Sequence, residues 1–459
     1  MELNGKRVLV LGLGRSGLAS ALFLKSHGAR VTVSDTKSED QLRDQIPALL
    51  DAGIAVETGG HTQRTLQNQD LLVVSPGVPV DAPPIVQARN LGHHVVGEIE
   101  LAAQFLKGPI VAITGSNGKT TTTTLIGEIL KAGGLKTLVG GNIGTAAISL
   151  AEKSTPETII VLEVSSFQLE TISAFRPKIA VVLNVTPDHL DRHRTFAAYV
   201  DAKARIFENQ TAEDFAVLNA DDPTCLELAG RTHAQVFWFS RKREIEAGAF
   251  VRAGRIAFQQ SGSEHEIMPV SEIPLKGAHN LENVLAAACA GSLMDCPAER
   301  IRAAVRNFKA VEHRLEFVAN IRGVEYYNDS KATNVDATIK ALESFPANIH
   351  LILGGKDKGS DYTVLNQLLR KRVKSVYTIG AAAETIQSQI KGAANIVSSA
   401  TIEAAVKQAT AAAQPGDIIL LAPACASFDQ FQNYEHRGRV FKELVHQLAG
   451  VSAAAEPRK

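Results

Sequence analysis

The chain has 459 residues, 45% hydrophobic and 21% charged, and its 48 basic side chains balance 48 acidic ones. This composition is typical of a globular protein with large cores, and about 150 residues per domain predicts three domains. Zero net charge argues against a protein that binds nucleic acid or an anionic membrane. Four scattered cysteines argue against a disulfide framework. The longest apolar runs are shorter than the roughly 18 residues that a membrane span needs. We therefore expect a reduced, cytoplasmic protein that binds no nucleic acid and does not insert into a membrane.

Short β-branched runs alternate with amphipathic stretches along most of the chain, which predicts parallel α/β domains. In a first domain, residues 1–97, we expect strands at 7–11, 30–34 and 71–75 and a helix at 18–26. In a second domain, residues 98–309, we expect helices at 99–106, 196–208 and 280–291, strands at 110–113, 158–164 and 179–185, and a small antiparallel sheet within 249–270. In a third domain, residues 310–459, we expect strands at 324–327, 349–353, 375–379 and 418–421 and a helix at 336–344.

A glycine-rich turn, Gly12-Leu13-Gly14-Arg15-Ser16-Gly17, lies between the first predicted strand and the first helix. Such a turn lets a phosphate approach a helix N-terminus closely. Asp35 ends the next strand, where a dinucleotide fold places its ribose-binding acid. On its own this pattern favours NAD and an oxidoreductase, but another nucleotide or a purely structural turn fits it equally well.

A second turn, residues 114–121, also joins a predicted strand to a helix and reads Thr-Gly-Ser-Asn-Gly-Lys-Thr-Thr. Its backbone amides and Lys119 could cradle a polyphosphate, and the Thr120 hydroxyl could reach Mg²⁺. Ile113 stands where a strict Walker A motif has its first glycine. The alternative is a Gly-Lys turn before a threonine-rich helix.

Acidic and imidazole groups follow two further strands of the same domain, at Glu163 and at Asp188-His189. Because ligands bind outside the carboxyl ends of parallel strands, these groups could hold a metal beside the phosphate turn. From the residues alone, Lys203 is interpreted as an exposed helix lysine. Asn280 and Asn283 share a helix face and could reach a base edge, although Asn280 could equally be an N-cap.

Polar loops follow three predicted strands of the third domain, at 328–334, 354–359 and 424–431. Functional side chains concentrate on such loops, so an anionic ligand is expected there. Cys425 has no basic neighbour in the sequence and is interpreted as a packing residue.

Taken together, the motifs resemble those of the ATP-dependent Mur ligases of peptidoglycan precursor synthesis, over essentially the whole chain. The resemblance is carried by residues 114–121, by EVSSFQL from Glu163 and by NVTPDHLD around His189. The loops NDSKATN at 328–334 and PACASFDQF at 423–431 resemble those of the member that adds D-glutamate to UDP-N-acetylmuramoyl-L-alanine.

The resemblance implies a Rossmann-like UDP-sugar domain over 1–97, a central P-loop ATPase domain over 98–309 and a C-terminal Rossmann-like domain over 310–459 that contacts D-glutamate and ATP. It implies an ATP site made of Gly115, Ser116, Asn117, Gly118, Lys119, Thr120, Thr121, Asn280, Asn283, His313, Arg314, Asp329 and Lys331. It implies a UDP-sugar site made of Gly14, Arg15, Ser16, Asp35, Thr36, Lys37, Ser75, Asn142 and His189. It implies D-glutamate contacts from Thr333, Lys358, Ser427 and Tyr434.

The resemblance also implies two Mg²⁺ sites, one held by Thr120 and Glu163 and the other by His189 and a carbamoylated Lys203. Lys119 and Arg314 would stabilise a transferring phosphoryl group, giving a catalytic set of Lys119, His189, Lys203 and Arg314. Two details stay open in this pattern. Either Lys356 or Lys358 could contact D-glutamate, and Tyr434 stands where family members can carry phenylalanine.

The implied reaction phosphorylates a carboxylate with ATP and then attacks the acyl phosphate with the amine of D-glutamate. We expect a monomer whose domains close about hinges near Gly97 and Ala310, with Arg314 and Lys331 apart from Lys119 in the open form. The alternatives are a sister Mur ligase or folylpolyglutamate-type ligase with another amino acid or acceptor, an NAD-dependent oxidoreductase, and a non-catalytic nucleotide-binding regulator.

Overall fold

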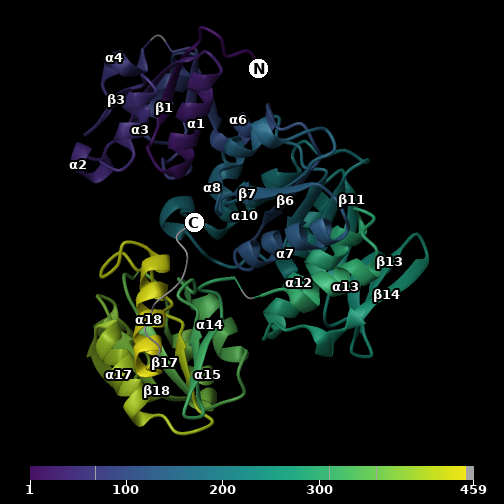
Figure 1. Cartoon of the computed structure of the whole chain (residues 1–459), viewed down its shortest axis with the longest axis vertical. Helices are drawn as coiled ribbons and strands as arrows, with labels where there is room; N and C mark the ends of the chain where they lie inside the picture. The colour runs from purple at the N-terminus through teal and green to yellow at the C-terminus, as the bar shows by residue number, and fades with distance from the viewer. Residues whose placement is uncertain (68, 310, 358, 451–459) are drawn as a thin grey trace. The chain divides into compact units, whose positions relative to one another are not determined.

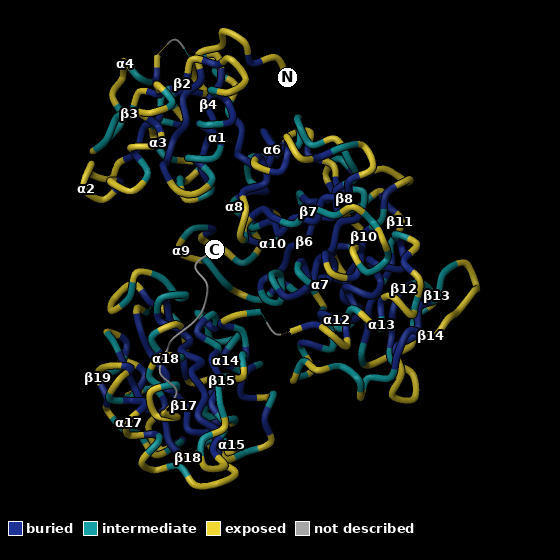
Figure 2. The backbone as a smooth tube through the Cα atoms, viewed as in Figure 1, coloured by how far each residue is buried: buried dark blue, intermediate teal, exposed yellow. Residues whose placement is uncertain are grey.

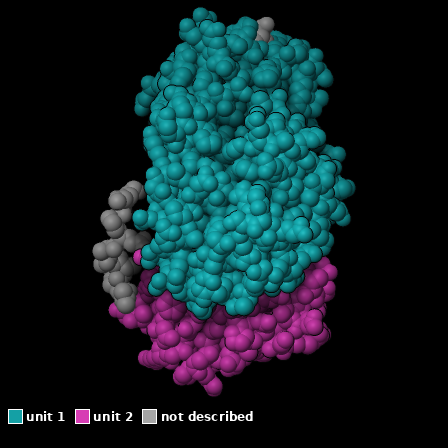
Figure 3. Space-filling model, turned by 90° about the vertical axis from the view of Figure 1, so that its right-hand side faces the viewer, with its two compact units in different colours: residues 1–272, 282–307 teal, residues 273–281, 308–459 magenta. Residues whose placement is uncertain are grey.

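A computed structural model of the chain describes residues 1–67, 69–309, 311–357 and 359–450. It divides into two compact units (Figure 3): unit 1 is Met1–Glu272 with Glu282–Asn307, and unit 2 is Ile273–Leu281 with Phe308–Lys459. Helix α12 (Ala278–Ser292) begins in unit 2 and continues into unit 1.

The first sheet of unit 1 has five parallel strands (Figure 1). Their spatial order is β3 (Ala55–Glu57), β2 (Arg30–Ser34), β1 (Arg7–Leu11), β4 (Leu71–Val74) and β5 (His94–Gly97). The helices of this part are α1 (Arg15–Ser26), α2 (Glu39–Leu42), α3 (Ile46–Asp51), α4 (Gln63–Leu66) and α5 (Pro83–Asn90). The strand order reverses between β1 and β4, and a crevice at the carboxyl ends of two such strands is where doubly wound sheets bind ligands.

The second sheet of unit 1 has nine strands, parallel from β7 to β12 and antiparallel at β13 and β14. Their order is β14 (Ser263–Pro269), β13 (Arg255–Gln260), β12 (Gly248–Arg252), β11 (Gln235–Ser240), β10 (Phe215–Asn219), β9 (Ile179–Val182), β6 (Ile110–Thr114), β8 (Ile159–Glu163) and β7 (Thr137–Gly141). The expected antiparallel region is therefore the far edge of the parallel sheet.

Helices of several lengths accompany this sheet, in addition to α12. They are α6 (Glu98–Ala103), α7 (Lys119–Ala132), η1 (Ala147–Lys153), α8 (Ser166–Leu169), α9 (Leu190–His193), α10 (Phe196–Ala204), η2 (Arg205–Phe207), α11 (Pro223–Leu228), η3 (Ala229–Arg231), η4 (Val270–Glu272) and α13 (Ala298–Asn307).

The sheet of unit 2 has six strands, all parallel except β15, which runs antiparallel to β16. Their order is β15 (Glu316–Ile321), β16 (Val324–Asn328), β20 (Ile418–Leu421), β17 (Ile349–Gly354), β18 (Val373–Ile379) and β19 (Asn395–Ala400). The helices are α14 (Val335–Glu343), η5 (Thr363–Leu365), α15 (Asn366–Arg372), α16 (Ala383–Gln389), α17 (Ile402–Ala412) and α18 (Tyr434–Leu448).

Both faces of the central strands are buried, as the dark tube in Figure 2 shows. On β17, Leu351 and Leu353 belong to one apolar cluster, whereas Ile352 between them belongs to another. Side chains alternate across a strand, so a continuous apolar run of this kind serves two cores at once. This explains why the strands were recognisable as unbroken β-branched runs.

The three α/β domains expected from the sequence are present, and strands β1, β2 and β20 have the expected limits. Strand β9 ends at Val182, three residues before the expected end at 185. Strand β7 was missed because it ends in Gly140 and Gly141, which lack the side chains that mark a strand. The domain limits 97/98 and 309/310 stay predictions, and residue 310 lies outside the described residues.

Among the described helices, none is both long enough and apolar enough to cross a membrane.

Candidate active site

The phosphate loop, residues 115–118, turns from β6 into α7 at the middle of the nine-stranded sheet. Gly118 has φ 87°, and a Cβ built on it would lie 2.2 Å from Oδ1 of Asn283. Thr122 of α7 donates a hydrogen bond of 3.3 Å to the same Oδ1. Glycine at 118 is therefore required both by the left-handed backbone and by the approach of α12.

The loop that follows β9 makes hydrogen bonds to the phosphate loop. The backbone N–H of Asn117 donates to Oδ1 of Asn184 at 2.9 Å. Oγ of Ser116 donates to the carbonyl of Thr186 at 2.8 Å and accepts from its N–H at 2.9 Å. Sequence reasoning missed Asn184 and Thr186, although both belong to the NVTPDHLD stretch that was singled out for His189.

Two lysines share one carbonyl oxygen at the phosphate loop. Nζ of Lys119 donates to the carbonyls of Gly115 and Ser116, at 2.7 and 2.8 Å. Nζ of Lys203 donates to the same Gly115 carbonyl at 2.9 Å and lies 4.5 Å from the ring centre of Tyr199. Both ammonium groups are thus held at the backbone of the phosphate loop.

Lys203 is 1% exposed, so the interpretation as an exposed helix lysine is wrong. Helix α10 turns this residue inward, where α10 packs under the phosphate loop. Burial above all, and then the positive charge of Lys119, lowers the pKa of Lys203 well below its ordinary value. The folded protein therefore favours a neutral amine at this position.

A buried carboxylate lies next to Thr120, at the start of α7. Glu163, at the end of β8, is 2% exposed and accepts hydrogen bonds from Oγ1 of Thr120 at 2.7 Å and from Nδ2 of Asn142 at 2.9 Å. A hydroxyl and a carboxylate are oxygen ligands of the kind that Mg²⁺ takes beside a phosphate. The donor chemistry of this pair therefore fits one Mg²⁺.

His189 lies at the start of α9 with a left-handed backbone, φ 54°. Its Nε2 is 3.6 Å from Oδ2 of Asp188, and its ring packs edge-on against Phe167. The next turn is anchored by His193, which is buried and lies 3.0 Å from Oγ of Ser166. Burial lowers the pKa of His193.

Within the part of the chain that the structure describes, no group of three or more His, Cys, Asp or Glu side chains has the arrangement of a metal site. The expected sites instead combine Thr120 with Glu163, and His189 with Lys203, so each would need ATP or a carbamate to complete its oxygen ligands.

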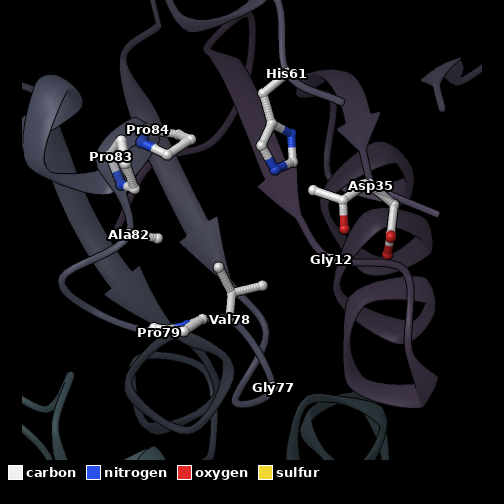
Figure 4. Close-up of a pocket in the computed structure, with 10 residues that line it drawn as sticks. Gly12, Asp35, His61, Gly77, Val78, Pro79, Ala82, Pro83 and Pro84 are labelled. Atoms are coloured by element: carbon white, nitrogen blue, oxygen red, sulfur yellow. The ribbon is translucent and has the colours of Figure 1, made fainter. Parts of the chain in front are cut away.

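A cavity of about 310 Å³ opens at the carboxyl ends of β1, β2 and β4 (Figure 4). It is lined by Gly12, Asp35, Thr36, His61, Gly77, Val78, Pro79, Ala82, Pro83 and Pro84. Of the residues expected at the UDP-sugar, Asp35 and Thr36 line it directly.

The other residues expected at the UDP-sugar shape this corner or lie near it. The Asp35 carboxylate accepts from the N–H of Leu13 at 2.6 Å and of Lys37 at 2.8 Å, so it ties two loops together. Ser75 donates to the Gly12 carbonyl at 2.7 Å. Gly14 precedes α1 as its N-cap, and Ser16 lies in its first turn. Arg15, at the first residue of α1, donates to the Gly144 carbonyl at 3.1 Å, next to the loop of Asn142.

In unit 2, the loops at 313–315 and 328–334 bind each other. Nδ2 of Asn328 lies 2.9 Å from Nδ1 of the buried His313, whose carbonyl accepts from the N–H of Lys331 at 3.1 Å. Asp329 accepts from the N–H of Leu315 at 3.2 Å, and burial raises its pKa to about 7.

Arg437 of α18 was missed by sequence reasoning, yet it joins both loops that identified the expected D-glutamate member. It is fully buried and donates to Oγ and O of Ser330 at 3.0 and 2.8 Å, and to the carbonyls of Cys425 and Ala426 at 3.1 and 3.4 Å. Burial lowers the pKa of Arg437 to about 10. An arginine that binds carbonyls across a domain leaves no local pattern in the sequence.

Of the residues expected at D-glutamate, Ser427 is buried beside this junction, and Thr333 lies in the other loop, 328–334. The ring of Tyr434 lies 3.8 Å from Nζ of Lys331. Lys358 lies outside the described residues. Asn280 donates to the Lys276 carbonyl at 2.7 Å within unit 2, whereas Asn283, one turn along the same helix, lies in unit 1.

A strand, a glycine loop, Lys119 and Thr120 at a helix start and a buried acid on the next strand define an α/β enzyme of the P-loop nucleotide-binding class. Three family models match in order: "Mur ligase MurD-like, N-terminal domain" at residues 6–97, "Mur ligase middle domain" at 113–291 and "Mur ligase, glutamate ligase domain" at 313–425. The chain belongs to the Mur ligase family, whose members are ATP-dependent and typically use Mg²⁺.

Relatives in two bacteria match the chain along nearly its whole length. A UDP-N-acetylmuramoylalanine–D-glutamate ligase of Koribacter versatilis is 64% identical over 98% of this chain and 99% of its own. One of the same name from Acidobacterium capsulatum is 59% identical over 99% of both chains. The solved structure of a pseudomurein peptide ligase type C from Methanothermus fervidus shares the fold, with a TM-score of 0.61 and 20% identity over 97% of this chain and all of its own.

Proposed function

We propose that this protein joins D-glutamate to UDP-N-acetylmuramoyl-L-alanine with ATP, through an acyl phosphate, in cytoplasmic peptidoglycan precursor synthesis. The observation that carries the proposal is the 64% identity, over nearly the full length of both chains, to a ligase named for this reaction. The hydrogen-bonded cluster of Thr120, Asn142 and the buried Glu163, with Lys119 at the same loop, supplies groups that the chemistry needs.

A carboxylate resists attack by an amine because oxide is a poor leaving group, and phosphorylation replaces it with phosphate. Catalysis then consists of positioning and charge neutralisation. In the proposal, Lys119 exchanges its two loop carbonyls for phosphate oxygens, and Thr120 and Glu163 hold one Mg²⁺ at the polyphosphate. Asn142, hydrogen-bonded to Glu163, faces the reacting end of the UDP-sugar.

Unit 2 completes the site in this proposal. Asn280, His313, Arg314, Asp329 and Lys331 contact ATP together with Asn283 of unit 1, and Arg314 shares the transferring charge with Lys119. Thr333, Ser427, Tyr434 and Lys358 receive D-glutamate, whose two carboxylates need cationic and hydroxyl partners. The buried Arg437 holds the two loops that carry Thr333 and Ser427.

Lys203 is proposed to react with CO₂. The neutral amine forms an N–C bond with the carbon of CO₂ and releases a proton. The resulting carbamate anion, together with His189, would hold a second Mg²⁺. The lowered pKa of Lys203 supports this step, because only an unprotonated amine has the lone pair to attack.

We expect Lys203→Ala to lose activity by at least about 100-fold, the usual order for removing one group that stabilises transition-state charge. ¹³C NMR after incubation with ¹³C-bicarbonate should show a carbamate signal in the wild type that is missing from the variant. An exposed lysine of unit 1, Lys131, provides the control as Lys131→Ala. Full activity of Lys203→Ala would remove the carbamate from the proposal.

The decisive experiment follows phosphate release from Mg-ATP with UDP-N-acetylmuramoyl-L-alanine, with D-glutamate, L-glutamate or no amino acid. Release that needs both the nucleotide-sugar and the D-isomer is expected. Release with another amino acid would point to a sister ligase, and release with a folate acceptor to a folylpolyglutamate-type ligase. No release, together with reduction of NAD, would return the function to an oxidoreductase. Light scattering of the same sample should give the mass of a monomer.

A further inference from the structure

His61 lines the cavity at the carboxyl ends of β1, β2 and β4. Figure 4 shows its imidazole projecting into the cavity between Asp35 on one side and Pro83 and Pro84 on the other. The prolines, with Val78, make an apolar surface suited to a flat ring. The lining thus combines a face for packing with one imidazole edge.

The far side of the ring is fixed by a buried hydroxyl. Nδ1 of His61 lies 2.7 Å from Oγ of Ser34, the last residue of β2, which is fully buried. The same Oγ lies 3.0 Å from Oε2 of Glu57 and 3.1 Å from the carbonyl of Gly60. Ser34 is therefore surrounded by three possible partners for one proton.

Glu57 is ionised in this arrangement. Burial raises the pKa of Glu57, but hydrogen bonds from Thr62, Thr65 and Ser34 lower it further, so the pKa lies below its ordinary value. A carboxylate and a peptide carbonyl accept hydrogen bonds but cannot donate them. The Ser34 proton must point towards Glu57 or Gly60, because otherwise two acceptor oxygens would face the hydroxyl lone pairs at close range.

The tautomer of His61 follows from this count. With its own proton committed, Ser34 can only accept from the imidazole, so Nδ1 carries the ring proton. In a neutral imidazole the other nitrogen is then an acceptor. Figure 4 shows that this nitrogen, Nε2, is the ring atom directed into the cavity.

We infer that His61 is a specificity-determining residue: its Nε2 accepts the imino N–H of a uracil ring that packs against Val78, Pro83 and Pro84, and so rejects cytosine. Uracil has a hydrogen on N3, whereas cytosine has a lone pair there, which would face the lone pair of Nε2. The inference rests on the proposed function, from which the UDP-sugar substrate comes. Ser34 acts as a positioning residue that sets the tautomer without touching the base.

The test is calorimetric binding of UDP and CDP at pH 8.5, where an ordinary imidazole is neutral. The wild type should bind UDP at least about tenfold tighter than CDP, the order expected when one hydrogen bond is replaced by two facing acceptors. His61→Ala should weaken UDP binding about tenfold and leave CDP unchanged. His94→Ala, an exposed histidine on β5 away from the cavity, should change neither.

Ser34→Ala separates the tautomer from the shape of the cavity. Without its acceptor, Nδ1 no longer holds the ring proton, the imidazole can place it on Nε2, and the preference for UDP over CDP should fall to within about threefold. Imidazole ¹H–¹⁵N spectra should show the Nδ1–H tautomer for the signals that vanish in His61→Ala.

Two results overturn the inference: UDP affinity in His61→Ala equal to that of the wild type, or a His61 spectrum with the proton on Nε2. Either result leaves the ligase intact if the wild type still binds UDP and turns over. If the wild type binds neither UDP nor CDP while it binds ATP, the proposed function fails instead.

Discussion

Gly118 has the least freedom of any residue in the phosphate loop, because backbone and neighbour both exclude a side chain there. Gly118→Ala should displace Asn283 and abolish ATP binding measured with a fluorescent nucleotide, since a Cβ would lie 2.2 Å from Oδ1 of Asn283. Gly134, after α7, also has a left-handed backbone, φ 83°, but open space around it. Gly134→Ala is therefore the matched control: it should cost about 1–2 kcal/mol of stability and leave nucleotide binding intact.

The burial of Glu98, the first residue of α6, should make the stability of the folded protein depend on pH. The side chain is 1% exposed, one oxygen accepts from the N–H of Ile148 at 2.8 Å, and the other has no partner among the described residues. Burial raises the pKa of Glu98 from 4.5 to about 7. The folded state therefore holds this proton more tightly than the unfolded state does.

Stability contributed by Glu98 should fall as pH rises from about 4.5 to 7 and stay low above that, a loss of about 3 kcal/mol. Glu98→Gln has no proton to lose, so relative to the wild type it should gain stability at pH 8 but not at pH 4.5. Thermal unfolding at both values measures the difference. Glu152→Gln, exposed in η1, should follow the wild type, and an equal response of both variants would contradict the prediction.

At the residue scale, side chains inside contiguous motifs could be predicted from the sequence. Lys119, Thr120 and Glu163 were found because a strand, a turn and a helix leave a local pattern. Lys203 was placed only by family resemblance, since its burial depends on how α10 packs under a loop 88 residues away. Asn184 was missed for the same reason, because its contact with Asn117 joins residues far apart in the sequence and leaves no regular spacing.

Among the elements, helix α18 holds together two loops of unit 2, 328–334 and 423–431, through Arg437. Arg437→Met keeps much of the volume but removes the Arg437 donor from the carbonyls of Ser330 and Cys425, whereas the Ala426 carbonyl keeps the N–H of Lys356 at 2.8 Å. Because such groups are costly to bury unpaired, unit 2 should lose about 3 kcal/mol in urea unfolding.

The control lies on the same helix. Arg439 is exposed, and Arg439→Met should change stability by less than about 0.5 kcal/mol. As a positioning residue, Arg437 should also affect the KM for D-glutamate more than the KM for the UDP-sugar. An Arg437→Met protein as stable as the wild type would show that the four hydrogen bonds carry no net stability.

Elements were predictable where both faces of a strand are buried, as in β1, β2 and β20. They were harder to predict where the side chains of a strand do not show the usual strand pattern. Strand β7 gives up side chains for two glycines, because a Cβ on Gly141 would lie 2.3 Å from the Glu163 carbonyl on the neighbouring strand. The requirement at Gly141 comes from the partner strand, whereas a Cβ on Gly140 would lie 2.4 Å from the Thr145 carbonyl.

On the scale of the whole molecule, the expected ATP contacts are divided between two units. Lys119 and Asn283 belong to unit 1, and Asn280, Arg314 and Lys331 belong to unit 2. Helix α12 carries Asn280 and Asn283 and passes from one unit to the other. The sequence predicts that the domains close when these residues bind ATP.

We therefore expect the radius of gyration in small-angle X-ray scattering to fall when a non-hydrolysable ATP analogue and UDP-N-acetylmuramoyl-L-alanine are both bound. Lys331→Ala should reduce the change while leaving the scattering of the free protein as it was. An unchanged radius with both ligands bound at saturation would contradict closure. Sequence alone could propose the hinges but not the units, because α12 reads as one ordinary helix.

In the nine-stranded sheet, β14 stands at one edge, with no further strand of the described residues on its outer side. Unpaired backbone groups of this kind can recruit a strand of another molecule, which leads to aggregation. The exposed half of β14 carries Glu264 and Glu266, each paired with an arginine, Arg252 or Arg255. A neighbouring copy would have to bury this row of charges to extend the sheet. These charges on the edge strand oppose its pairing with another copy of the chain, a physical role separate from catalysis.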